Sequence, residues 1–177
     1  MRASSSYSLQ MLPQRHPLAT YRRQLVAEGG SLSVVVNGDE IGLQLRCGEY
    51  TVLATSYDYF DGCNHWIYLL DREGMPVDQL STPDQPGVIQ DVAIVSPNEV
   101  AFGYFGTHDR WNLTVREHGF WSYTPATLLK RFNCFFLAKR RLEITCTKGK
   151  PWSLPAALNP SVERVAPNLS GTARTKE

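Results

Sequence analysis

The middle of the chain contains the same order of features twice, once around Trp66 and once around Trp111. Each copy has a β-rich run, a polar tip, a run that begins near tryptophan, a turn containing Arg, Glu and Gly, and a third run. Such runs, separated by turn residues, predict antiparallel strands. Two repeat units, at about 50–83 and 99–125, are therefore expected to form three-stranded meanders.

This repetition limits the possible folds. The two tryptophans are 45 residues apart, a spacing that also occurs in propeller blades, but two units cannot close a ring of four or more blades. We expect a mainly β (β-rich α+β) protein. Its antiparallel meanders, with their internal duplication, would form a sandwich, an open barrel or one long twisted sheet, accompanied by one or two short helices.

Helices are expected in two places outside the repeats. Residues 16–28 begin with a proline near the first helical position and are followed by a glycine pair, which suits a helix end. Residues 125–137 carry leucine and phenylalanine at helical spacing. A Phe-rich strand is the alternative for the second segment.

A hairpin is expected between residues 32 and 46. Two runs of β-formers are joined there by Asn37-Gly38, the strongest two-residue hairpin signal because both positions adopt positive φ. The remaining organisation follows from composition. Residues 1–15 are Ser-rich and expected to be disordered, residues 16–150 form one β-rich domain, and residues 151–177 form a flexible Pro-rich tail.

The small net charge of +1 hides a strong segregation along the chain. Residues 28–117 hold fourteen acidic and four basic residues, whereas residues 130–150 hold seven basic and one acidic. Residues 1–27 contain four arginines and no acid. The folded protein could therefore present one-signed faces that steer a charged partner. Alternatively, the basic ends fold against the acidic middle and cancel it.

The cysteines and the lengths of the apolar runs indicate in which cellular compartment the protein is expected. The four cysteines form no CxxC pair, and residues 1–30 contain no apolar stretch long enough for a signal peptide. No run of 18 apolar residues is present either. We expect a cytoplasmic protein with reduced thiols and no membrane span.

Potentially reactive side chains gather on the tip of the first repeat, where Asp58, Asp61, Cys63 and His65 could support nucleophilic or metal chemistry. The spacing of two residues between the thiol and the imidazole does not supply the in-line geometry that catalysis requires. An ordinary polar tip is the preferred interpretation. No catalytic residue, metal ligand or cofactor is assigned, and the common nucleotide and hydrolase motifs are absent from the sequence.

A contact surface is the stronger interpretation of the two tips. His108 and Asp109 occupy the second tip where Asn64 and His65 occupy the first, and loops of repeated units often lie together. Aromatic residues mixed with polar groups are typical of protein-binding surfaces. Basic residues near 130–141 could instead indicate nucleic-acid or membrane-surface binding. We interpret them as the solvated side of a helix, so nucleic-acid binding is not expected.

The leading hypothesis is a non-enzymatic protein-binding module. Its most specific form is a cytosolic inhibitor or immunity-type protein that sequesters a basic partner such as a nuclease toxin, because an acidic surface accelerates association with a basic one. The alternatives are a small metal- or Cys/His-dependent hydrolase, or a structural subunit of a larger assembly, and the oligomeric state is left open. The predicted partner-binding residues are Asp58, Tyr59, Phe60, Asp61, His65, Trp66, Asp84, His108 and Asp109.

Overall fold

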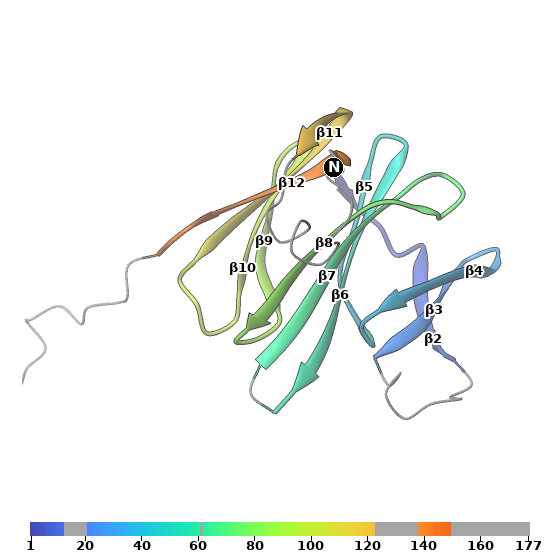
Figure 1. Cartoon of the computed structure of the whole chain (residues 1–177), viewed down its shortest axis with the longest axis horizontal. Coiled ribbons are helices and arrows are strands. Elements are labelled where there is room, and N and C mark those ends of the chain that lie inside the picture. The colour runs from blue at the N-terminus through green and yellow to red at the C-terminus, as the bar shows by residue number, and fades with distance from the viewer. Residues whose placement is uncertain (13–20, 61, 123–137, 150–177) are drawn as a thin grey trace, which may run out of the picture.

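The computed structural model describes residues 1–12, 21–60, 62–122 and 138–149. Within these residues it contains twelve strands and no helix (Figure 1). The strands are β1 (Arg2–Ala3), β2 (Tyr7–Met11), β3 (Arg22–Ala27), β4 (Gly30–Asn37), β5 (Glu40–Cys47), β6 (Tyr50–Tyr59), β7 (Gly62–Leu70), β8 (Pro76–Gln85), β9 (Ile89–Ser96), β10 (Glu99–Tyr104), β11 (Arg110–Ser122) and β12 (Ala138–Thr147). The prediction of a mainly β, antiparallel protein is confirmed.

The strands form three open sheets stacked as layers (Figure 1). The central sheet has the order β1-β5-β6-β7-β8, the large outer sheet β12-β11-β10-β9, and the small outer sheet β2-β3-β4. One hydrophobic cluster joins the central sheet to the large outer sheet, and a second joins it to the small outer sheet. The fold is therefore a sandwich with a shared middle layer.

The middle layer is buried on both faces, and its sequence explains why. In β6, Val52 and Ala54 pack against the large outer sheet, whereas Leu53 between them packs against the small outer sheet. β7 does the same with Ile67 on one face and Tyr68 on the other. A strand covered on both sides needs apolar residues at consecutive positions, which matches the uninterrupted apolar run in β7.

The N-terminal residues are ordered, so the prediction of disorder over residues 1–15 is wrong for β1 and β2. Tyr7 and Leu9 alternate with polar residues and pack on the cluster beneath the small outer sheet. The backbone N–H of Tyr7 donates to Gln44 Oε1 at 3.0 Å, and Gln44 Nε2 donates to the Tyr7 carbonyl at 2.7 Å. The Ser-rich composition concealed this short amphipathic strand.

The helix predicted over residues 16–28 is also wrong in its described part, where Arg22–Ala27 forms β3. Leu25 is fully buried and pairs with Leu9 of β2. The helix prediction rested on the flanking proline and glycine pair, together with the spacing of four between Tyr21 and Leu25. That spacing fits one face of a helix, but it fits one face of a strand equally well because four is even.

Asn37-Gly38 does not close a hairpin, because β4 and β5 belong to different sheets. The pair forms a corner at which the chain crosses from the small outer sheet to the central sheet. Gly38 has φ of +99°, and a Cβ atom there would lie 2.7 Å from the Cβ of Thr55. The turn residue was identified correctly, but the strand that passes against it is β6 rather than β5.

The two repeat units differ in the structure. β6, β7 and β8 form the predicted three-stranded meander, with Pro76 at the start of an edge strand. In the second unit, the predicted turn at residues 116–119 is a bulge within β11. Val115 and Phe120 on either side both pair with β12. Gly119, with φ of +67°, accommodates the bulge. The predicted third strand of that unit is therefore a continuation of the second.

Several predictions fall outside the described residues, namely the helix or strand at 125–137, the tail at 151–177 and Cys134. Cys47, Cys63 and Cys146 are free thiols. No helix in the described part of the chain has the length and apolar character to cross a bilayer.

Candidate functional site

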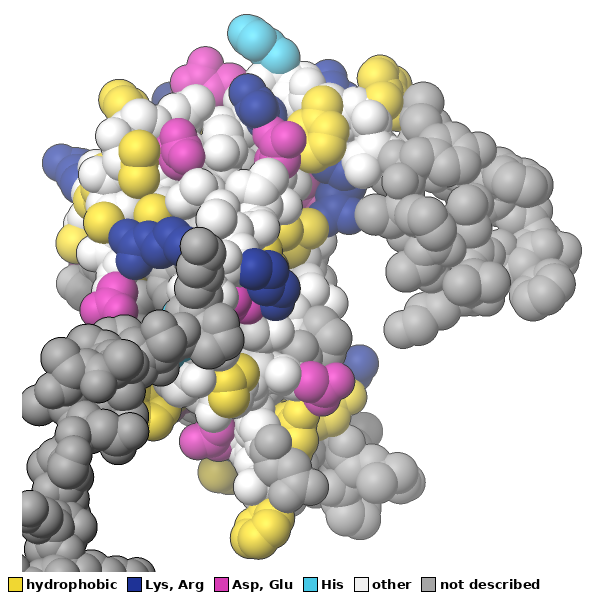
Figure 2. Space-filling model, turned by 90° about the vertical axis from the view of Figure 1, so that its left-hand side faces the viewer, with side chains coloured by type: hydrophobic (Ala, Val, Ile, Leu, Met, Phe, Trp, Pro, Cys, Tyr) yellow, Lys and Arg dark blue, Asp and Glu magenta, His cyan; other side chains and the backbone are white. Residues whose placement is uncertain are grey.

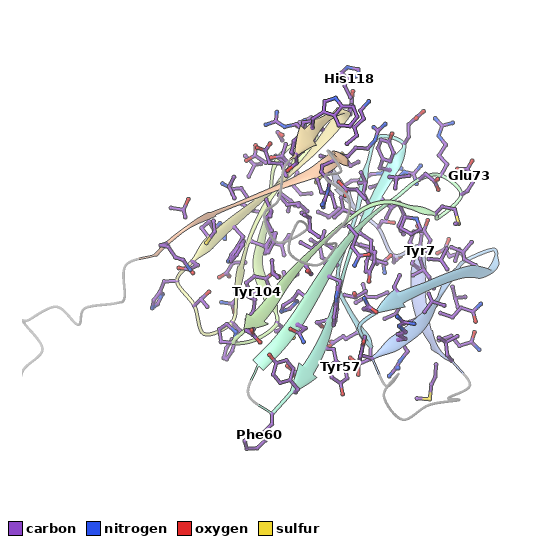
Figure 3. The ribbon with its side chains drawn as sticks, in the orientation of Figure 1. Tyr7, Tyr57, Phe60, Glu73, Tyr104 and His118 are labelled. Carbon is purple, nitrogen blue, oxygen red and sulfur yellow. The ribbon has the colours of Figure 1, made fainter. Side chains whose placement is uncertain are left out.

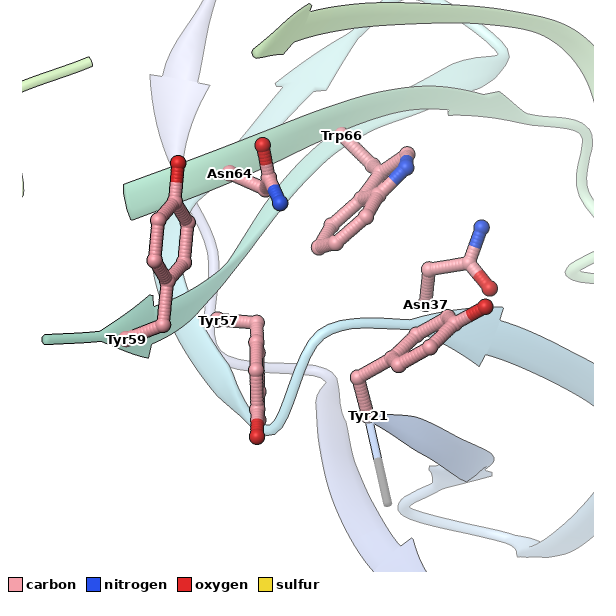
Figure 4. Close-up of a pocket in the computed structure, with 6 residues that line it drawn as sticks. All are labelled: Tyr21, Asn37, Tyr57, Tyr59, Asn64 and Trp66. Carbon is pink, nitrogen blue, oxygen red and sulfur yellow. The ribbon is translucent and has the colours of Figure 1, made fainter. Parts of the chain in front are cut away.

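An aromatic pocket opens at the end of the small outer sheet, where the described residues leave part of the central sheet uncovered (Figure 4). Its volume is about 480 Å³. This lies within the range of roughly 300–1,000 Å³ that is common for ligand pockets. The lining residues, four aromatic and two amide, are Tyr21, Asn37, Tyr57, Tyr59, Asn64 and Trp66. We call this cavity the aromatic pocket.

Strand alternation places these side chains together. Tyr57 and Tyr59 continue the face of β6 that carries Leu53, and Trp66 occupies the face of β7 that carries Tyr68. Further in, the small outer sheet covers this face. Toward the β6–β7 turn no strand of the described residues covers this face, so it becomes the wall of the pocket. Tyr57 pairs directly with Asn64 across the two strands, which sets the register of the wall.

The rings are held by one another. Tyr21, at the start of β3, stacks on Trp66 with ring centroids 5.9 Å apart and planes 7° from parallel. The Tyr21 ring also meets Tyr57 at 6.0 Å and an angle of 57°. Both arrangements are favourable for aromatic pairs. The walls of the pocket therefore come from both sheets and have defined orientations.

A carboxylate is fixed at the rim of the pocket. Asp84 has φ of +56° and sits in an irregularity of β8, where Cys63 pairs with Gln85 but His65 pairs with Thr82. Such bulges re-aim side chains. The Tyr59 hydroxyl donates to Asp84 Oδ1 at 2.6 Å, and the Asp84 backbone N–H lies 3.4 Å from Asn64 Oδ1. The bulge thus brings a negative charge to the aromatic wall.

The tip of the β6–β7 hairpin projects beyond the sheets (Figure 3). Phe60 at this tip is fully exposed, and Asp58 and Tyr59 beside it are also exposed. Burying an aromatic side chain is a large favourable contribution to association, so a phenylalanine kept entirely in water is a candidate contact residue. Asp61 lies outside the described residues.

The second tip lies at the same end of the molecule, next to the loop between β8 and β9. The Phe105 backbone N–H donates to the Val88 carbonyl at 2.9 Å, and His65 Nε2 lies 3.0 Å from the Gly87 carbonyl. Three loops therefore gather at this end, although the β8–β9 loop stands between the two tips. His108 is exposed there.

Asp109 is occupied by internal partners. Its carboxylate accepts hydrogen bonds from Lys148 Nζ at 2.6 Å and from the Gly149 backbone N–H at 3.1 Å. The hydrogen bond from Lys148 is the main cause of a lowered pKa at this carboxyl, and the Gly149 N–H adds to it. The charge of Asp109 is therefore compensated within the chain, which makes it a poor centre for an acidic docking surface.

Part of the charge segregation seen along the sequence is cancelled in the fold. Asp78 lies 2.7 Å from Arg140, Asp109 is bound to Lys148, and Asp39 lies 3.8 Å from Arg23. Figure 2 shows basic and acidic side chains interspersed over the face on the side of the large outer sheet. Asp58 and Asp84 form no ion pair with any residue that the structure describes.

Cys63 and His65 face away from the aromatic pocket, into the core beneath the large outer sheet. Burial raises the pKa of the Cys63 thiol to about 11, and the nearby Asp58 carboxylate adds to this. Burial also lowers the pKa of His65, whose ring lies 4.5 Å from that of Tyr104. A reactive cysteine needs an accessible thiolate, which this site does not provide.

The structure brings together only part of the predicted contact set. Tyr59, Trp66 and Asp84 meet at the aromatic pocket, with Asp58 and Phe60 on the adjoining tip. Of the other predicted residues, His65 is buried and Asp109 is bound by Lys148 and Gly149. No group of three His, Cys, Asp or Glu in the described residues is placed to hold a metal ion.

Sequence reasoning missed four residues of the pocket: Tyr21, Asn37, Tyr57 and Asn64. The alternation of Tyr57 with Tyr59, and of Asn64 with Trp66, was a usable signal, because two neighbouring strands placed these side chains on one face. Nothing in the sequence showed that Tyr21 and Asn37 would approach from another sheet.

Comparisons with protein-family models, with curated proteins and with solved structures find no match to this chain.

Proposed function

We propose that the chain is a non-enzymatic protein-binding module that docks on a partner through the β6–β7 hairpin. The observation that carries the proposal is the fully exposed Phe60 at the hairpin tip, next to the aromatic pocket. Interface energy concentrates in a few aromatic side chains that become buried on binding. Phe60 supplies a projecting anchor and the pocket supplies a cavity, so the two features together suit a structured partner.

The charges on this hairpin favour a basic partner. Asp84 lies beside the aromatic side chains, whereas Asp58 lies on the opposite face of β6, near Cys63. Neither carboxylate has an ion-pair partner within the described residues. Unpaired carboxylates at the edge of an interface accelerate association with a positively charged surface and make it sensitive to salt. A module of this kind can act as an inhibitor by covering the active surface of a basic enzyme such as a nuclease.

A hydrolase mechanism at the same tip has weaker support. Cys63 and His65 lie on the buried face of β7, and the thiol pKa is about 11. Nucleophilic catalysis by cysteine depends on the thiolate. The accessible groups of the hairpin are instead a phenylalanine, tyrosines and carboxylates, which suit recognition.

The proposal is tested by capturing partners from an extract of host cells with tagged protein. Wild type, Phe60→Ala and Trp121→Ala are compared at low and high salt. Trp121 is the matched control because it is 64% exposed but follows His118 on β11, at the end of the molecule opposite Phe60 (Figure 3). A basic protein captured by wild type and Trp121→Ala, and lost with Phe60→Ala or high salt, supports the proposal. Capture that is indifferent to Phe60→Ala contradicts it.

A second candidate is a structural subunit, which the edge strand β9 favours. Val92, Ile94 and Val95 are 42%, 46% and 58% exposed on this strand. Edge strands with exposed apolar residues are prone to pair with other chains. Light scattering tests this candidate: oligomers that dissociate on Ile94→Lys support it, and a monomer at all concentrations contradicts it.

A further inference from the structure

We propose that the aromatic pocket binds the guanidinium group of an arginine side chain presented by the partner. This inference rests on the proposed function and specifies the chemistry of its partner. The pocket combines electron-rich rings, oxygen acceptors and a rim carboxylate, and none of its six lining residues is basic. This combination matches a planar cation better than an anion or an aliphatic group.

The rings provide the first part of the argument. In Figure 4, Tyr59 stands across the pocket from Trp66 and Tyr21, while the Tyr57 ring contacts that of Tyr21. The faces of tyrosine and tryptophan attract cations through the ring quadrupole, and arginine stacks on them through its flat guanidinium. Because Trp66 and Tyr21 are already stacked on each other, their orientation is fixed before any ligand arrives.

The polar atoms provide the second part. Asn37 and Asn64 line the pocket with side-chain amides, whose carbonyl oxygens accept hydrogen bonds. A guanidinium has five N–H donors in one plane and no acceptor, so it can use several such oxygens at once. Asn64 Oδ1 receives only a long contact, 3.4 Å from the Asp84 backbone nitrogen, and retains capacity for a donor from the ligand.

The rim charge provides the third part. Asp84 Oδ1 accepts a hydrogen bond of 2.6 Å from the Tyr59 hydroxyl, so the negative charge lies directly beside an aromatic wall. This hydrogen bond draws electron density onto the Tyr59 ring and strengthens its attraction for a cation. Two basic residues, Arg22 and Arg23, come directly after Tyr21 in the chain, but neither lines the pocket. Arg23 lies 3.8 Å from the Asp39 carboxylate, and Arg22 is exposed.

The geometry of the hairpin fits a side chain delivered by a protein. The pocket adjoins Phe60, so a partner surface that buries the phenylalanine also passes over the pocket mouth. A long, unbranched arginine side chain can then reach the cavity from that surface. A neutral sugar would use the same flat rings and amides and could donate a hydroxyl hydrogen bond to Asp84. It could not form an ion pair with that carboxylate, whereas a guanidinium can form both the hydrogen bonds and the ion pair.

The test uses small probes and the intact protein. N-acetyl-arginine amide is titrated into ¹⁵N-labelled protein, and N-acetyl-citrulline amide serves as a neutral probe of the same shape. The indole N–H signal of Trp66, assigned with Trp66→Phe, reports binding. The proposal expects arginine to shift this signal and to bind at least about fivefold more tightly than citrulline. Asp84→Asn, which keeps the shape of the rim, should reduce that preference, and the control Trp121→Leu should retain it.

Three outcomes overturn the inference: equal affinity for arginine and citrulline, arginine shifts that avoid Trp66, or binding of glucose without binding of arginine. Asp84→Asn and Trp121→Leu are both read alongside the folded-state spectrum, so a loss caused by unfolding is recognised directly. Partner capture through Phe60 is measured independently. If the protein still captures a partner through Phe60 but does not bind the arginine probe, this inference is wrong and the proposed function remains supported.

Discussion

At the scale of single residues, alternation along β7 separates the side chains that can contact a ligand from those that are buried in the core. Asn64 and Trp66 face the aromatic pocket, whereas Cys63 and His65, each one position away, face the core. Shifting a strand by one residue exchanges its two faces. The sequence analysis assigned Cys63 and His65 to a polar tip, whereas both lie within β7. Which face each residue takes depends on the layers that cover β7, and that information lies in distant segments.

His65 gives the first prediction, which concerns pH. The ring is almost fully buried, its Nε2 donates to the Gly87 carbonyl, and its Nδ1 has no partner among the described residues. Burial lowers the pKa of His65 below its ordinary value of 6.5, and this outweighs the opposing effects of Gly87 and Asp58. Below about pH 6.5 the unfolded chain therefore binds a proton that the folded protein resists. The free energy of unfolding should fall as the pH falls below that value.

The measurement is urea unfolding at intervals between about pH 5 and 7.5, the range in which histidine charge changes. His65→Gln should flatten the acid side of the stability profile. His118→Gln, on an exposed position of β11, is the control and should keep the wild-type slope. An unchanged slope in His65→Gln would mean that other groups cause the acid dependence.

At the scale of elements, the sequence predicted strands well and their partners poorly. The runs that became β6, β7, β9 and β10 carry local patterns of β-formers between turn residues, and these patterns sufficed. The corner at Asn37-Gly38 and the bulge at residues 116–119 were read as ordinary turns. In both places, the conformation depends on a strand that is distant in sequence: β6 for the corner and β12 for the bulge.

Asp78 gives a prediction about how two elements are joined. Its side chain is 6% exposed and links β8, an edge of the central sheet, to β12, an edge of the large outer sheet. Oδ2 accepts from the backbone N–H groups of Arg141 and Leu142 at 2.6 and 2.8 Å, and Oδ1 lies 2.7 Å from Arg140 Nε. Asp78→Ala leaves these donors without an acceptor, so the expected loss of unfolding free energy is about 3 kcal/mol.

The matched control for Asp78 is the exposed ion pair between Arg116 and Glu143, which join β11 and β12 at 2.6 Å. Glu143→Ala should cost less than about 1 kcal/mol because water competes for both groups. Chemical denaturation followed by tryptophan fluorescence measures both variants. Equal costs for the two substitutions would show that the Asp78 link between the sheets contributes no more to stability than an exposed ion pair.

At the scale of the whole molecule, the two features that matter most for function arise only on folding. The charge segregation along the chain predicted either an acidic face or internal cancellation, and the ion pairs of Asp39, Asp78 and Asp109 compensate part of the acidic segment. The aromatic pocket exists because the small outer sheet is shorter than the sheet it covers. Neither property could be predicted from periodicity, which reports that a strand has two buried faces but not what covers each.

The layering leads to a last prediction. The cluster between the central and large outer sheets contains twelve buried residues, and the cluster under the small outer sheet contains six. Regions with less buried apolar contact open more readily. In hydrogen exchange followed by mass spectrometry, amides of β2–β4 should exchange faster than those of β6 and β7. Leu25→Ala, which removes a fully buried side chain from the smaller cluster, should cost about 2–5 kcal/mol locally and accelerate exchange in β2–β4 while leaving β10 and β11 protected. Equal acceleration in every layer would show that the three sheets unfold as one unit, and the walls that Tyr21 and Asn37 give the pocket would then be as stable as the core.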